Sequence, residues 1–80
     1  MTVNREKMVV SYEIDKEDLD YFKDILLGLG IYDDRIDVDK KLFKKTLNVI
    51  IKDVNIELME TIERAMYENK VASYGQTCWF

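Results

Sequence analysis

Residues 8–30, MVVSYEIDKEDLDYFKDILLGLG, contain a strand pattern followed at once by a helix pattern. Apolar side chains occupy the even-numbered positions at the start of this stretch, which predicts a half-buried strand over 7–14. Asp15 is a good N-cap residue, and apolar residues then recur at helical spacing, which predicts a helix over 16–28. Gly30 is suited to end this helix in the left-handed conformation. The fold can be worked outward from this joint between a strand and a helix.

A second joint of the same kind lies at Val54-Asn55, 40 residues after Ile14-Asp15. Either Asp53 or Asn55 can cap the helix that follows it. The apolar positions of the strand before this joint are odd-numbered, whereas those of the first strand are even-numbered, so the correspondence between the two halves slips by a residue or two. The elements predicted for the rest of the chain are a strand over 31–38, a strand over 42–52, a helix over 54–68 and a strand over 71–79.

The predicted order is therefore strand, helix, strand, strand, helix, strand. This is the order of the split βαβ, or ferredoxin-like, α+β fold in a single domain over 1–80. Two right-handed crossovers place both helices on one face of a four-stranded antiparallel sheet in the spatial order 4-1-3-2. The strands over 31–38 and 71–79 are then the two edges of the sheet. Many unrelated activities use this fold, so it says little about function.

Composition excludes several classes of chemistry. The 80 residues include no histidine and one cysteine, which rules out Ser-His-Asp and Cys-His catalysis and an internal disulfide. We predict no catalytic residues, no cofactor and no metal site, and hence a protein that is not an enzyme. The first apolar stretch is too short for a signal peptide or a membrane span, which favours a cytoplasmic protein without a membrane partner.

The net charge of −4 comes from the first half of the chain, because residues 1–40 hold 11 acidic and 6 basic side chains. This acidity argues against direct binding to nucleic acid. It predicts an anionic surface that attracts a basic surface of another protein, although acidic residues near a helix N-terminus also serve stability and solubility. The predicted acidic partner surface consists of Glu17, Asp18, Asp20, Asp24, Asp33, Asp34 and Asp37.

The chain ends in aromatic residues that predict either part of the core or an interface. Tyr74, Trp79 and Phe80 are of the type that contributes most to binding energy at interfaces. Trp79 and Phe80 are consecutive, so in a strand they point to opposite faces and only one of them can be core. We therefore expect a homodimer formed through the open face of the sheet or through an edge strand.

The function favoured by these patterns is a small, acidic, protein-binding domain without enzymatic activity. A specific form of this hypothesis is an inhibitor from a phage or another mobile element that blocks a nucleic-acid enzyme of its host. The first alternative is a dimeric regulatory module that binds a small molecule. The second is a minimal metal-dependent nuclease, in which Asp15 at the end of the first strand would bind the metal.

Overall fold

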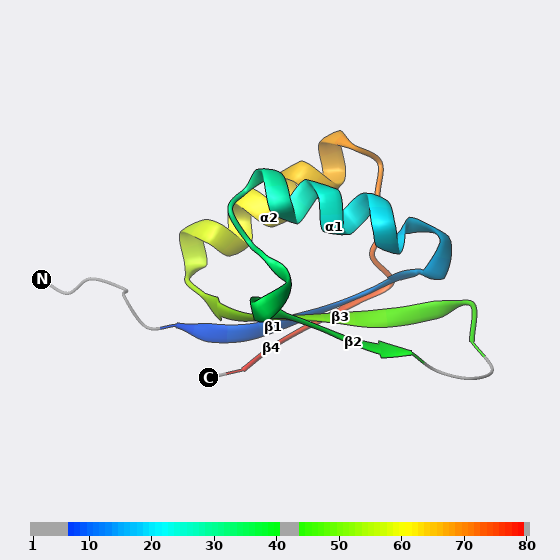
Figure 1. Cartoon of the computed structure of the whole chain (residues 1–80), viewed down its shortest axis with the longest axis horizontal. Helices are drawn as coiled ribbons and strands as arrows, with labels where there is room; N and C mark the ends of the chain where they lie inside the picture. Colours follow the sequence, from blue (N-terminus) through cyan, green and yellow to red (C-terminus); the bar gives the residue numbers. More distant parts are fainter. Residues whose placement is uncertain (1–6, 41–43, 80) are drawn as a thin grey trace, which may run out of the picture.

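The computed structural model describes residues 7–40 and 44–79, and in it a four-stranded antiparallel sheet carries two helices on one face (Figure 1). The strands are β1 (Met8–Asp15), β2 (Ile36–Lys40), β3 (Thr46–Val54) and β4 (Gly75–Trp79), and the helices are α1 (Leu19–Gly28) and α2 (Ile56–Glu68). The order across the sheet is β2-β3-β1-β4, which read from β4 is 4-1-3-2. The predicted α+β class and strand order are confirmed, and β2 and β4 form the edges.

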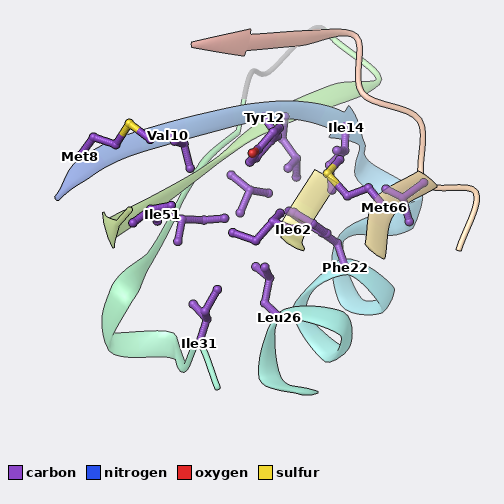
Figure 2. Close-up of a cluster of buried hydrophobic side chains, with 14 residues drawn as sticks. Met8, Val10, Tyr12, Ile14, Phe22, Leu26, Ile31, Ile51, Ile62 and Met66 are labelled. Carbon is purple, nitrogen blue, oxygen red and sulfur yellow. The ribbon is translucent and has the colours of Figure 1, made fainter. Parts of the chain in front are cut away.

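The core lies between the sheet and the helices, where side chains from both layers converge (Figure 2). The even-numbered residues of β1 point into it, as their alternation predicts. Tyr12 of β1 meets Phe22 of α1 edge to face, with ring centroids 6.2 Å apart and ring planes at 82°. The core residues that are at most 1% exposed are Val10, Tyr12, Ile14, Phe22, Leu26, Ile31, Leu47, Val49, Ile51, Val54 and Ile62.

The first helix begins later than predicted. Lys16–Asp18 forms a 3-10 turn, and α1 starts only at Leu19. The reason is that the Lys16 amide donates to the carbonyl of Lys45, directly before β3, so the sheet still holds the chain at the position where an α-helix would begin. Asp15 occupies the N-cap position of this 3-10 turn, but its side chain makes no capping hydrogen bond.

Both edge strands are shorter than predicted at their N-terminal ends. Residues 31–35 do not extend the strand, because a 3-10 turn (Asp33–Arg35) precedes β2 and the Arg35 amide donates to the carbonyl of Tyr32. Residues 71–74 lie outside β4 because the Val71 amide donates to the carbonyl of Met66, so the chain leaves the end of α2 late, and the Tyr74 amide then reaches β1 at the carbonyl of Glu13. A hydrogen bond to the preceding helix or turn thus replaces a ladder bond at Val71 and at Arg35.

The second half of the chain also departs from its predicted boundaries. The strand predicted over 42–52 is observed as β3, and residues 41–43 lie outside the described residues. β3 runs on through an irregularity in its pairing with β1, where Asp53 has a φ of 59°. The helix predicted over 54–68 begins at Ile56, because the Asn55 side chain caps it by accepting a hydrogen bond from the Leu58 amide at 2.7 Å.

Candidate functional site

A hollow of about 560 Å³ opens between α1 and the turn that leads into β2. Its position follows from the helix period, because residues 20, 23, 24 and 27 lie on one side of α1. Gly30, with a φ of 86°, then reverses the chain so that the next four residues return along the same side of the helix. The lining residues are Asp20, Lys23, Asp24, Leu27, Ile31, Tyr32, Asp33 and Asp34.

The charged side chains that line this hollow are mostly negative. Its lining includes four aspartates, two from α1 and two from the turn, and Lys23 is the one cation among the described residues that line it. The Lys23 ammonium lies 3.6 Å from Asp33, which is 85% exposed. Arg35 is not among the lining residues, and its guanidinium donates to the backbone carbonyls of Lys52 and Asp53 rather than to a carboxylate of the hollow. A negative potential therefore remains in the hollow.

Apolar surface accompanies the charge. Leu27 is 53% exposed and Tyr32 is 59% exposed, while Ile31 is buried at the base. Exposed aromatic and aliphatic groups with charged residues around them are typical of protein interfaces, where the apolar groups contribute affinity and the charges contribute orientation and association rate. We name this surface, lined by the eight residues given above, the acidic hollow.

The structure brings together four of the seven predicted acidic surface residues, namely Asp20, Asp24, Asp33 and Asp34. The other three do not line the acidic hollow. Asp37 lies on β2 and forms an ion pair with Lys52 at 3.2 Å. Glu17 lines a different depression, which also contains Asp15 and three lysines. Asp18 ends the 3-10 turn before α1 and makes no capping hydrogen bond with its side chain.

The predicted aromatic interface is described in part. Tyr74 is 59% exposed, and its hydroxyl donates to Asp15 at 3.0 Å. This hydrogen bond and the negative charge of Asp15 raise the pKa of Tyr74. The backbone of Trp79 pairs with Val9 in the sheet. The side chain of Trp79 and the whole of Phe80 lie outside the described residues, so their predicted roles stay predictions.

Sequence reasoning missed a second hollow of about 260 Å³ between α2 and the start of β4. At its centre is the half-buried carboxylate of Glu63, which accepts hydrogen bonds from the Tyr12 hydroxyl at 3.3 Å and from Gln76 at 2.6 Å. Burial of the ring, followed by the charge of Glu63, raises the pKa of Tyr12. A weak signal was present: Gln76 is polar, yet it shares the inward-facing side of the sheet with its strand partner Tyr12.

Within residues 7–40 and 44–79, no group of three or more His, Cys, Asp or Glu side chains is arranged to hold a metal ion. The described helices include none with the length and apolar character needed to cross a bilayer.

The chain matches no family model, no curated protein and no solved structure in comparisons with known proteins.

Proposed function

We propose that this chain is a non-enzymatic protein-binding domain whose acidic hollow receives a basic surface of another protein. The observation that carries this proposal is the assembly of Asp20, Asp24, Asp33 and Asp34 around exposed Leu27 and Tyr32. Two segments that are separate in the sequence contribute to it. A surface of charge alone would serve solubility, but charge together with exposed apolar groups suits specific binding.

The partner that fits best is a protein with a Lys- and Arg-rich surface. Proteins that bind nucleic acid have such surfaces, because they neutralise phosphates with basic side chains. Carboxylates placed around a hollow can occupy the same basic groups. Competition of this kind is how a small acidic protein would inhibit a nucleic-acid enzyme, which is the specific form of the proposal.

The test compares two charge-reversed variants with the wild type. Asp20→Lys/Asp24→Lys changes the acidic hollow, and Glu57→Lys/Glu68→Lys makes the same change in charge on exposed positions of α2. The pair is well matched, since Asp20 and Glu57 both lie in the first turn of a helix. Each protein is immobilised and exposed to nuclease-treated lysate from the source or its host, and captured proteins are identified by mass spectrometry.

We expect a basic protein that the wild type and the α2 variant retain and that the acidic-hollow variant loses. With that protein purified, the association rate constant should fall at least about tenfold for Asp20→Lys/Asp24→Lys, with a steep dependence on salt. Tyr32→Ala should mainly raise the dissociation rate constant. Equal retention by the three proteins, or capture of no other protein, would contradict the proposal.

A further inference from the structure

The outer edge of β4 exposes backbone groups that no described strand pairs. The Lys16 amide donates to the Lys45 carbonyl, and this bond continues the ladder between β1 and β3. It shows which residues of β1 form their backbone hydrogen bonds with β3 and which form them with β4. Even-numbered residues of β1 therefore bond to β3, and odd-numbered residues bond to β4. In β4, the odd-numbered residues face β1. The amides and carbonyls of Gln76 and Cys78 consequently point away from the sheet.

The two edges of the sheet differ in how they are protected. β2 has the sequence IDVDK, and its charged side chains discourage another strand from pairing there. β4 has the sequence GQTCW, without a charge or a proline. Residues 75–78 are all exposed. β4 is therefore the edge at which an additional strand can pair.

The side chains beside β4 indicate the charge of such a strand. Glu63 projects from α2 to Gln76, and no described Lys or Arg forms an ion pair with it. Tyr67, on the rim of the same hollow, is 85% exposed. A half-buried carboxylate in a hollow that Tyr12 and Tyr67 also line is a favourable receptor for an ammonium or guanidinium group, which gains the charge pair and can contact an aromatic ring.

We propose that β4 receives an extended, basic segment of another protein as a fifth strand, with a Lys or Arg side chain of that segment bound to Glu63. Adjacent strands lie about 4.8 Å apart, a gap that a lysine or arginine side chain spans easily. Such a side chain next to Gln76, on the helix-covered side of the sheet, reaches the carboxylate. The backbone pairing contributes affinity, and the alternate basic side chains contribute specificity.

A second copy of this chain fits the same edge poorly. Each copy has a net charge of −4. Antiparallel pairing of two β4 strands about Thr77 would bring the Glu63 side chains of both copies to one side of the joined sheet. Like charges that face each other across an interface oppose association. The favoured partner of this edge is therefore a basic strand from a different protein.

The β4 edge and the acidic hollow are separate surfaces. The acidic hollow is lined by α1 and by the turn before β2, and β2 is at the other edge of the sheet. The two surfaces can be tested separately. Asp20→Lys/Asp24→Lys should leave binding at β4 unchanged, and a failure at β4 leaves the proposed function of the acidic hollow standing.

The probe is a labelled peptide of about seven residues in which Lys alternates with Thr, so that all its lysines share one face of a strand. Its dissociation constant is measured by fluorescence anisotropy, and amide hydrogen exchange is followed by NMR with and without peptide. In the free chain, the amides of Gln76 and Cys78 should exchange faster than that of Thr77. Saturating peptide should slow the exchange of those two amides. Without peptide, their exchange rates should not depend on the protein concentration.

Two pairs of substitutions separately test whether peptide binding needs backbone pairing at β4 and whether it needs the charge of Glu63. Cys78→Pro removes an outward amide while leaving the ladder to β1 complete, and Cys78→Ser is its matched control. Cys78→Pro should weaken peptide binding at least about tenfold, and Cys78→Ser should not. Glu63→Gln should weaken it about tenfold, whereas Glu57→Gln, which changes a residue outside the hollow, should have little effect.

Three results would overturn the proposal. The first is equal affinity for a peptide with Glu in place of each Lys, because charge would then play no part. The second is unchanged exchange of the Gln76 and Cys78 amides at saturation, which would exclude strand addition without relying on any variant. The third is protection of those amides that rises with protein concentration in the absence of peptide, which would assign the edge to a second copy.

Discussion

The two halves of the molecule have the same arrangement of elements but differ in the side chains of their edge strands. Residues 8–40 and 46–79 each form a strand, a helix and an edge strand. Both helices end in the same hydrogen-bonding motif: the Ile31 amide donates to Leu26, and 40 residues later the Val71 amide donates to Met66. All four of these side chains are buried. The repeat therefore extends from topology to individual core positions.

The structure also explains why the repeat slips in the sequence. The inward residues Val49 and Ile51 of β3 follow Val10 and Tyr12 of β1 by 39 residues. At the irregularity around Asp53 the second strand contains one extra residue, so Val54 falls 40 after Ile14. One extra residue in β3 therefore explains why the inward positions are even-numbered in β1 and odd-numbered in most of β3. At this place Arg35 from the first half donates hydrogen bonds to the carbonyls of Lys52 and Asp53.

The difference that matters for function lies in the edge strands. Ile36 and Val38 of β2 pack against the core. The residues 40 positions later, Gln76 and Cys78 of β4, are exposed and contact Met59 of α2. The same backbone arrangement thus gives one edge that completes the core and one that stays open. A repeated topology does not imply repeated function, because side chains decide what each edge can bind.

The largest expected effect tests whether the two halves share one core. Phe22→Ala should lower the free energy of unfolding by about 3–5 kcal/mol, because Phe22 is fully buried and leaves a cavity. Urea unfolding should show the same loss by circular dichroism and by fluorescence of Trp79, although Trp79 belongs to the other half. Two separate transitions would mean that the halves fold independently.

The next effect appears at high pH and concerns Tyr12, whose matched position in β3 is the apolar Ile51. Because folding raises the pKa of Tyr12, the unfolded chain loses this proton first. Stability should be constant below the ordinary tyrosine pKa of about 10 and then fall by up to about 1.4 kcal/mol per pH unit above it.

Urea unfolding from pH 8 to pH 11 measures this slope. Tyr12→Phe should remove most of it. Tyr67→Phe is the matched control for the loss of a phenol hydroxyl, since Tyr67 is largely exposed. An unchanged slope in Tyr12→Phe would assign the pH dependence to another group.

The third comparison is between the residues that precede the two helices. Asn55→Ala should cost about 1 kcal/mol, because it removes the capping hydrogen bond to the Leu58 amide. Asp15→Ala, 40 residues earlier, should cost less than about half as much, since among the described residues its side chain makes no capping hydrogen bond and accepts an exposed hydrogen bond from Tyr74. Thermal and urea unfolding measure both values, and equal losses would show that Asp15 caps a helix in solution.

The smallest effects should have opposite signs at two equivalent positions. Gly30 and Lys70 both have positive φ, at 86° and 59°, and each lies two residues after the end of its helix. Gly30→Ala should destabilise by about 1 kcal/mol through the backbone alone, because nothing lies within 4 Å of the added methyl group. Lys70→Gly should stabilise by about 0.5–1 kcal/mol. Midpoints that shift in the same direction would contradict this reading of the two helix ends.

Local patterns were sufficient to predict the elements and the strand order. The even-numbered apolar residues of β1, the helical stripe that includes Phe22 and Leu26, and the glycine at position 30 each depend on neighbours within a few residues. Boundaries failed where a distant contact intervened. The carbonyl of Lys45 delays α1, and nothing in the sequence near Lys16 indicates that bond.

The candidate surfaces were likewise predicted only in part from the sequence. The sequence by itself determined that the first half is acidic and that β4 lacks charge, because these are properties of composition. Only the tertiary structure decided that Asp33 stands beside Lys23, and that Glu63 meets both Tyr12 and Gln76. These contacts join residues that are ten or more positions apart in the chain, and they form only when the backbone between them is folded, which no local pattern records.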